Sequence, residues 1–333
     1  MNSLTPRWLV GICLLLMTAC GGDTPVQIRG QTMGTYYAVQ YLPRECEPAK
    51  ALFETRLQAL NKVFSTYMED SEISRLNQST ATNWVDVSAE FAKVLQVAAA
   101  VHEDTFGALD ITLAPLIDLW GFGPGATRRL PDLEAQANAA ANVGMELLEL
   151  RGTELRKHQA GVRIDLSALA KGYAVDEMVA ELDKAGCRNA MADIGGEIRV
   201  LGQRDVDQPW RVGIEIPSVE QAGMVQGVIG LVDMAIATSG DYRNFQVLEG
   251  RNVHHIFDPW KKAPAQTEVA SVTVVHDSAM LADAYATAFM VLGKDRALSV
   301  ANEIQLPVYL ITRDADNLYS HYNDAMQALL LNP

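Results

Sequence analysis

The stretch 280–292 constrains the fold more than any other part of this sequence. It reads MLADAYATAFMVL, so apolar residues would occupy nearly every side of a helix formed here. A helix that is apolar all round is buried, and the rest of the chain must therefore pack around it. The polar residues Asp283 and Thr287 lie four positions apart, which places them on one face of the helix.

Asp283 needs a compensating positive charge, because a buried carboxylate without a partner is costly. The stretch 280–292 contains no Lys or Arg. A hard cation with oxygen ligands would meet this need, and one carboxylate with few other protein ligands suits Mg²⁺ beside a substrate phosphate. The alternative is that Asp283 merely caps the N-terminus of the helix, a position that Asp favours.

The stretch 163–176, RIDLSALAKGYAVD, predicts the end of a strand followed by a helix with Asp165 as its N-cap. Leu169 and Tyr173 fall on one face of that helix. A helix N-terminus has unpaired N–H groups and a partial positive charge, so it can bind an anion. Lys171 lies near enough to reach a bound phosphate. The same residues also fit a plain strand-to-helix turn with a surface lysine.

Two further clusters carry chemically useful side chains. Neighbouring residues on a strand point to opposite faces, so His254 and His255 cannot both bind one metal from a strand. One of them could act as a general base or contact a phosphate, although a structural histidine is the alternative. The segment TSGDY at 238–242 adds hydroxyl groups and a glycine at the end of a predicted strand.

The N-terminus has the features of a targeting segment. Arg7 precedes an apolar run at 8–17 that is too short to span a bilayer. The residues MTAC that end at Cys20 resemble the cleavage site of a bacterial lipoprotein, in which this cysteine is lipidated. An ordinary secretory signal with an incidental cysteine is the alternative. Either way we expect an exported protein, and the first reading predicts a lipid anchor on the periplasmic side of a bacterial membrane. The expected organisation is a signal peptide at 1–19, a lipidated tether at 20–27 and one domain at 28–333.

Charge and cysteine content narrow the function classes. The chain has 27 Lys and Arg against 41 Asp and Glu, a net charge of −14, which excludes nucleic-acid binding through a general basic field. Beyond the signal and Cys20, the chain keeps Cys46 and Cys187. An oxidising compartment permits a disulfide between them, but the sequence leaves their pairing open.

The order of elements predicts an α+β fold with mixed, largely antiparallel sheets and packed helices, because strands joined by short turns alternate irregularly with helices. Predicted helices cover 48–63, 88–101, 132–142, 165–186 and 280–292. Predicted strands lie at 26–29, 35–41, 147–150, 154–158, on both sides of the glycine turn 195–196, and at 211–216, 227–231, 235–238, 244–248 and 271–275. A turn and a short strand are expected within 104–115.

Six segments, in order along the chain, together resemble the ApbE family, the FAD:protein FMN transferases. They are TMGT at 32–35, DLSALAKGYAVD at 165–176, DIGGE at 193–197, TSGDY at 238–242, HIFDP at 255–259 and ADAYATA at 282–288. The resemblance implies one catalytic domain that binds FAD and Mg²⁺, transfers FMN to a threonine hydroxyl of a target protein and releases AMP. The implied targets are flavoprotein subunits of Na⁺-translocating NADH:quinone reductase or related electron-transfer complexes.

The resemblance also implies roles for individual residues. The FAD contacts would be Met33, Tyr67, Ala108, Leu109, Asp110, Asp165, Lys171, His255 and Ile256. The Mg²⁺ ligands would be the Asp283 carboxylate, the Thr287 hydroxyl and the main-chain carbonyl of Ala168. His255 would take the proton from the incoming threonine, with Asp283 as the alternative base.

The segment after Pro259 departs from the family pattern. The family usually continues into Thr-Gly or Arg-Thr-Gly, whereas this chain has Trp260-Lys261-Lys262-Ala263. The missing glycine bears on the protein substrate more than on the metal site. Two other functions use the same residues: a Mg²⁺-dependent FAD pyrophosphatase that gives FMN and AMP, and a non-catalytic FAD-binding lipoprotein.

Overall fold

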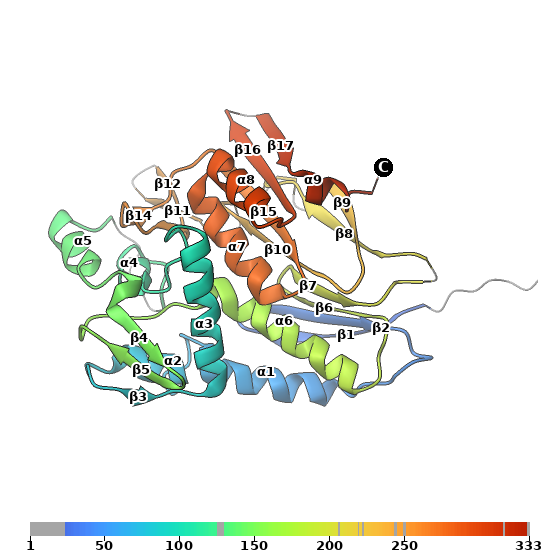
Figure 1. Cartoon of the computed structure of the whole chain (residues 1–333), viewed down its shortest axis with the longest axis horizontal. Coiled ribbons are helices and arrows are strands. Elements are labelled where there is room, and N and C mark those ends of the chain that lie inside the picture. The colour runs from blue at the N-terminus through green and yellow to red at the C-terminus, as the bar shows by residue number, and fades with distance from the viewer. Residues whose placement is uncertain are drawn as a thin grey trace, which may run out of the picture.

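The protein is described here by a computed structural model (Figure 1). It describes residues 24–124, 130–205, 207–218, 220–221, 223–242, 245–248, 251–315 and 317–331. The predicted signal peptide at 1–19 and the predicted lipidation site Cys20 lie outside these residues. In the described part of the chain, no helix has both the length and the apolar character needed to cross a bilayer.

An eight-stranded sheet forms the centre of the fold, with the order β1-β2-β6-β7-β10-β15-β16-β17. Every neighbouring pair in this sheet is antiparallel. The strands are β1 Val26–Thr32, β2 Thr35–Tyr41, β6 Ala190–Ile194, β7 Glu197–Leu201, β10 Ala235–Gly240, β15 Val269–His276, β16 Val308–Asp314 and β17 Asn317–Tyr322. The sheet confirms the predicted α+β class with antiparallel pairing.

Two layers of helices cover one face of the sheet. Helix α6 (Ser167–Lys184) contacts β6 and β7, and α7 (Ala279–Leu292) contacts β10 and β15 (Figure 1). Helices α1 (Lys50–Phe64) and α3 (Ala89–Asp104) pack against them from outside. In α7, every residue except Leu281 and Thr287 is buried, which confirms the burial predicted from its composition.

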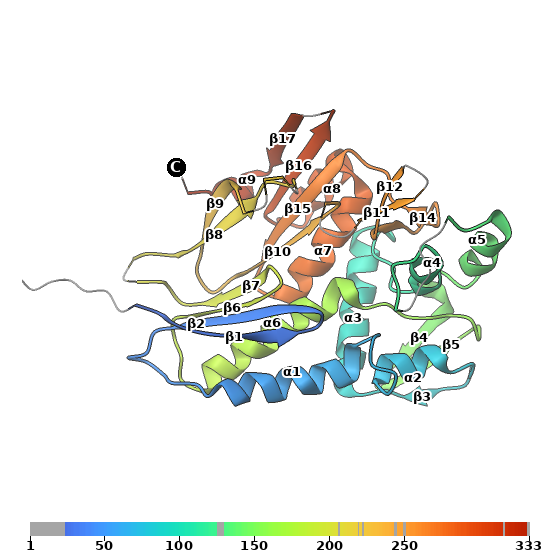
Figure 2. The same ribbon diagram turned by 180° about the vertical axis from the view of Figure 1, so that it is seen from behind.

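The other face of the sheet carries a second, smaller core. Strands β8 (Trp210–Glu215) and β9 (Val225–Leu231) form a hairpin there, and Met326 of α9 (Asp324–Gln327) is buried with them. Figure 2 views the molecule from behind and shows this hairpin near the C-terminus. The remaining elements are α2 Glu72–Gln78, β3 Val85–Asp86, α4 Ala114–Leu119, α5 Leu133–Ala140, β4 Leu148–Arg151, β5 Glu154–Lys157, β11 Phe245–Leu248, β12 Arg251–His254, β13 Phe257–Asp258, β14 Ala263–Pro264 and α8 Lys294–Glu303.

Helices α6 and α7 approach each other at backbone distance. A Cβ atom on Gly172 would lie 2.3 Å from the carbonyl oxygen of Ala279, so only glycine fits there without a shift. One turn further along α6, the Asp176 carboxylate accepts hydrogen bonds from the N–H groups of Ala279 (2.8 Å) and Met280 (3.1 Å). These N–H groups belong to the unpaired first turn of α7, so Asp176 helps to cap it together with the N-cap residue Ser278.

Two predictions about secondary structure, at 104–115 and at 163–165, are wrong. The segment 104–115 forms turns and the start of α4 instead of a short strand, because Asp110 accepts a hydrogen bond from the Thr112 N–H two residues later. Residues 163–164 are not in a strand either, and the N-cap of α6 is Leu166 rather than Asp165. The Asp165 side chain still accepts a 2.9 Å hydrogen bond from the Ser167 N–H, so it satisfies a donor at this helix start.

The question of the two cysteines is answered by a disulfide between Cys46 and Cys187. The bond joins the loop that follows β2 to the end of α6, across a sequence separation of 141 residues. Both cysteines are buried, and both belong to the main core.

Candidate active site

A cleft of about 350 Å³ opens where α6, α7 and β10 meet. The start of α6 forms one wall, the end of β10 and the segment 255–257 form another, and α7 lies between them. The main-chain bond from Asp165 N–H to the Ile111 carbonyl (2.8 Å) holds the segment 108–111 against the start of α6. The cleft brings together these residues implied by the family resemblance: Ala108, Leu109, Asp110, Asp165, Ala168, Lys171, His255, Ile256, Asp283 and Thr287.

Met33 and Tyr67 are the two predicted flavin contacts that do not line this cleft. Met33 lies in the β1–β2 turn with φ +48° and packs against the main core. Tyr67 is 76% exposed. Its neighbour Thr66 lines a pocket of about 290 Å³ that shares Asp165 with the cleft, so a long ligand could extend from the cleft toward Tyr67.

A buried ion cluster forms the floor of the cleft. The Lys171 Nζ atom lies 3.4 Å from Oδ2 of Asp283 and 3.4 Å from Oε1 of Glu197. The Gly172 N–H also donates to Oδ2 of Asp283, at 3.4 Å. The side chains of Asp283 and Glu197 are almost fully buried, whereas that of Lys171 is 30% exposed. The positive charge that α7 itself lacks therefore comes, at least in part, from Lys171 of α6.

The electrostatics of this cluster follow from burial and proximity. Burial raises the pKa of Asp283, and Lys171 and the Gly172 N–H only partly oppose this shift. Burial works to lower the pKa of Lys171, but the Asp283 and Glu197 carboxylates together raise it above its ordinary value. Lys171 is therefore charged and faces the cleft, where it can contact an anionic substrate. The helix-cap alternative for Asp283 is wrong, because Ser278 caps α7.

Oxygen atoms cluster beside this charge. The Thr287 Oγ1 atom lies 3.1 Å from Oγ of Ser239, which stands near the end of β10. Next to it, the hydroxyls of Thr238 and Thr273 are 2.8 Å apart and link β10 to β15. Among the described residues, no group of three or more His, Cys, Asp or Glu side chains gathers as a metal site. Any metal bound here would therefore need hydroxyl, carbonyl or substrate oxygens in addition to carboxylates.

The two histidines face different cavities, as their adjacent positions predict. His255 lines the cleft, and its ring centroid is 6.5 Å from that of Phe122. His254 ends β12 and lines a separate pocket. Burial lowers the pKa of His254, so the imidazole is favoured in its neutral form.

Asp110 is the ionisable residue of the loop 108–111 among the predicted FAD contacts. Burial raises its pKa, while the hydrogen bonds from the Thr112 N–H and hydroxyl oppose the shift. The Thr112 hydroxyl also accepts from the Gly144 N–H at 2.7 Å. Asp110 therefore holds the loop in shape in addition to facing the cleft.

The segment after Pro259 forms a tight turn without the family's glycine. Oδ1 of Asp258 accepts from the N–H groups of Trp260 and Lys261, both at 2.9 Å. Lys262 takes the left-handed conformation, with φ +53°. The Asp258 side chain thus stabilises this turn, which in the family pattern contains a flexible glycine.

Sequence reasoning assigned no role to Glu197 or Ser239, although both lie in segments that carry the family resemblance. Glu197 starts the strand after the Gly195–Gly196 turn and is 4% exposed. Alternation along this strand groups Glu197 with Arg199, on the face opposite Ile198 and Val200, so no local pattern marked Glu197 as buried.

Known proteins are similar to this chain over most of its length. The ApbE family model matches residues 33–310. The chain is 39% identical to a FAD:protein FMN transferase of Vibrio cholerae, over 97% of this chain and 99% of the relative. It is 38% identical to a FAD:protein FMN transferase of Haemophilus influenzae, over 95% of this chain and 94% of the relative.

Solved structures show the same fold. The flavin transferase ApbE from Vibrio cholerae matches with a TM-score of 0.85 and 38% identity, covering 93% of this chain and 100% of that chain. The ApbE protein from Thermotoga maritima matches with a TM-score of 0.84 and 28% identity, covering 93% of this chain and 100% of that chain. By sequence and by structure, the chain belongs to the ApbE family.

Proposed function

We propose that this protein transfers FMN from FAD to a threonine hydroxyl of an acceptor protein, with Mg²⁺, and releases AMP. Full-length relatives named FAD:protein FMN transferase support the reaction. The observation that carries the proposal is the Lys171–Asp283 pair at the floor of a cleft beside a helix N-terminus. This arrangement suits a pyrophosphate, because a partly exposed cation and the start of a helix favour anions.

The oxygen donors in the cleft fit Mg²⁺. The Asp283 carboxylate, the Thr287 hydroxyl and the Ala168 carbonyl are hard ligands from two adjoining helices, and all three residues line the cleft. The Lys171–Asp283 distance of 3.4 Å exceeds the roughly 2.7–2.9 Å of a strong charge-assisted hydrogen bond, so the lysine leaves the carboxylate incompletely compensated. Bound Mg²⁺ would neutralise charge that develops on the pyrophosphate oxygens.

The protein's own residues would hold FAD and move one proton. Lys171 and the first N–H groups of α6 bind the phosphates, and the ligand extends past Asp165 toward Thr66 and Tyr67. The acceptor hydroxyl oxygen attacks the FMN phosphorus, the bond from that phosphorus to the AMP oxygen breaks, and AMP departs on the opposite side. His255 takes the hydroxyl proton. We assign this role to His255 because Oδ2 of Asp283 already accepts from Lys171 and Gly172.

The acceptor and the location follow from the same proposal. The acceptor is a flavoprotein subunit of Na⁺-translocating NADH:quinone reductase or of a related electron-transfer complex. A lipid on Cys20 anchors the enzyme to the periplasmic side of a bacterial membrane, where such subunits expose their threonines. Metabolic labelling with a palmitate analogue would test the anchor, and a Cys20→Ala variant that keeps the label would contradict it.

The reaction is tested with purified mature protein, FAD and one such subunit, with and without Mg²⁺. We expect a protein band with covalent flavin fluorescence and a matching amount of AMP, both only when Mg²⁺ is present. AMP and free FMN without a labelled band would instead identify a FAD pyrophosphatase, because water would have replaced the threonine. FAD that is bound but remains intact would identify a flavin carrier that catalyses no reaction.

A further inference from the structure

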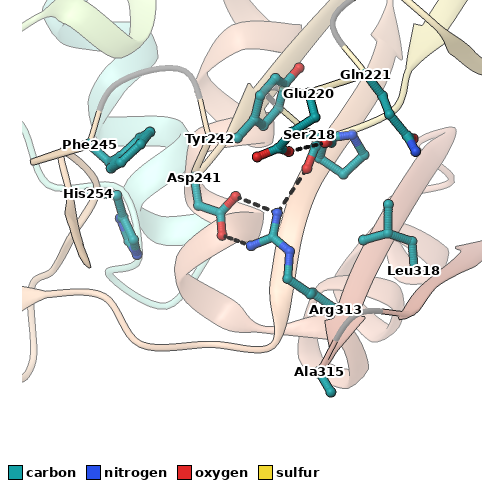
Figure 3. Close-up of a pocket in the computed structure, with 11 residues that line it drawn as sticks. Ser218, Glu220, Gln221, Asp241, Tyr242, Phe245, His254, Arg313, Ala315 and Leu318 are labelled. Atoms are coloured by element: carbon teal, nitrogen blue, oxygen red, sulfur yellow. Dashed lines mark hydrogen bonds and ion pairs between the residues drawn. The ribbon is translucent and has the colours of Figure 1, made fainter. Parts of the chain in front are cut away.

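A second pocket, of about 570 Å³, lies next to the candidate active site. Residues 217–218 and 220–221, which follow β8, form one side, and Arg313, Ala315 and Leu318, where β16 ends and β17 begins, form another. Figure 3 shows Arg313 at its centre, between Asp241 and the loop that carries Ser218. His254 and Phe245 stand on the side opposite Leu318 in the same view. The volume is in the usual range for ligand pockets, roughly 300–1,000 Å³.

Two short segments separate this pocket from the cleft. Ser239 and Gly240 of β10 line the cleft, and the next residues, Asp241 and Tyr242, line the second pocket. The Tyr242 ring lies directly against Gly240, since a Cβ atom there would be 2.6 Å from the ring. The two adjacent histidines also line different cavities, since His255 lines the cleft and His254 lines the second pocket. The two cavities thus share a thin wall that includes the proposed base.

The proposed reaction needs a second substrate beside FAD. In-line displacement requires the attacking oxygen and the leaving oxygen on opposite sides of the phosphorus. The start of α6 occupies one side of the cleft, where Asp165 connects it to the pocket near Thr66. The second pocket adjoins the other wall, beside His255. We infer that this second pocket receives the segment of the acceptor protein that flanks its reactive hydroxyl, an inference that rests on the proposed function.

The charges in the pocket favour a peptide over the phosphate groups of a nucleotide. Arg313 is already held by Asp241, with its Nη1 and Nη2 atoms 2.7 Å and 3.3 Å from the carboxylate, and it donates to the Pro217 carbonyl at 2.9 Å. The Glu220 carboxylate accepts from the Ser218 hydroxyl at 2.8 Å. Two carboxylates against one paired guanidinium would repel a pyrophosphate.

The uncharged lining offers what a peptide segment needs. Ser218 and Gln221 carry groups that can donate to and accept from a peptide main chain. Phe245, 43% exposed, and Leu318 provide apolar contact for its side chains. The Arg313–Asp241 pair joins β16 to the end of β10, so the floor of the pocket is fixed relative to the cleft. A pocket held in this way would position the acceptor hydroxyl against the phosphorus.

A Gln221→Trp variant tests the inference, because Gln221 is exposed at the rim and a tryptophan there would fill part of the pocket. The matched control is Gln27→Trp, an exposed position on edge strand β1. The probe is the purified reductase subunit used above. We expect the KM for this subunit to rise at least about tenfold in Gln221→Trp, as for loss of an interface anchor, and to stay unchanged in the control. The Kd for FAD, from flavin fluorescence quenching, stays unchanged in both.

A second variant, Phe245→Ala, removes apolar contact without adding bulk, and we expect a smaller increase in the same KM. An unchanged KM for the subunit in both pocket variants would overturn the inference. A parallel loss of FAD affinity would also overturn it, by assigning the pocket to part of FAD. Failure of the unmodified enzyme to label any acceptor, despite FAD binding, would instead refute the proposed function on which the inference rests.

Discussion

The Lys171 Nζ atom lies 3.4 Å from Oδ2 of Asp283, across the contact between α6 and α7. Oε1 of Glu197 lies at the same distance from the ammonium group. The partly exposed ammonium group of Lys171 is therefore paired with two buried carboxylates. A divalent cation beside Asp283 would add positive charge next to a bound pyrophosphate.

Replacement of Lys171 by Met removes the ammonium group that lies beside the buried carboxylates of Asp283 and Glu197. We expect a loss of about 3 kcal/mol in the free energy of unfolding, the low end of the range for a broken buried pair because the ammonium is partly exposed. Millimolar Mg²⁺ should raise the melting temperature of Lys171→Met more than that of the unmodified protein, since ligand binding to the folded state stabilises it. Lys184→Met, on the exposed end of the same helix, is the control and should change neither quantity. An equal Mg²⁺ effect in both proteins would contradict this account.

The Gly172→Ala substitution places a Cβ atom against the backbone of Ala279. The helices α6 and α7 must then separate, and we expect a destabilisation of about 1–3 kcal/mol, typical of overpacking. Urea denaturation measures the change. Gly227→Ala is the matched control, because a Cβ atom there meets Leu330 at an ordinary 3.6 Å. Equal stability of the two variants would show that the helices can separate freely.

The disulfide between Cys46 and Cys187 closes a long loop, so it restricts the unfolded chain. The double variant Cys46→Ala/Cys187→Ala should lose about 2–5 kcal/mol in the free energy of unfolding. A reductant should lower the denaturation midpoint of the unmodified protein and leave that of the double variant unchanged. An unmodified protein insensitive to reductant, with free thiols by alkylation, would show that the bond does not form.

His254 should make the fold sensitive to acid. Burial holds its folded-state pKa below the ordinary value of 6.5, although Asp241 opposes the shift. The unfolded chain then binds more protons than the folded one below pH 6.5, so stability is present above that pH and is lost as the pH falls toward the folded-state pKa. For one titrating group, the free energy of unfolding changes by at most about 1.4 kcal/mol per pH unit. Between pH 6.5 and 5, the free energy of unfolding of His254→Gln, measured by urea denaturation, should fall less steeply than that of the unmodified protein. An equal fall in both proteins would show that His254 does not cause the acid sensitivity.

Much of the fold could be predicted because its signals are local. The apolar stretch 280–292 requires a buried helix, and the helix start predicted at residue 88 and the glycine turn 195–196 are boundaries that the structure reproduces. The short strand predicted within 104–115 does not form, because the Asp110 side chain accepts a hydrogen bond from the Thr112 N–H and favours a turn.

The partner of Asp283 could not be predicted from any local pattern. Lys171 is 112 residues away in sequence, and only the packing of α6 on α7 brings the two together. The Cys46–Cys187 bond is a pairing of the same kind. Sequence segments identified many of the residues that line the cleft, but not Glu197 or Ser239, and the contact of Lys171 with the two carboxylates required the tertiary structure.

The most direct test of the central claim compares Asp283→Asn with Asp295→Asn, an exposed aspartate on α8 whose side chain is 88% exposed. Covalent flavin on the acceptor subunit is measured by intact mass, at saturating FAD and Mg²⁺, after circular dichroism has verified that both variants are folded. The account predicts that Asp283→Asn lowers the labelling rate by about 100-fold or more, as for loss of a group that stabilises transition-state charge, while Asp295→Asn labels at the normal rate. Labelling by Asp283→Asn at the rate of the unmodified enzyme would contradict it.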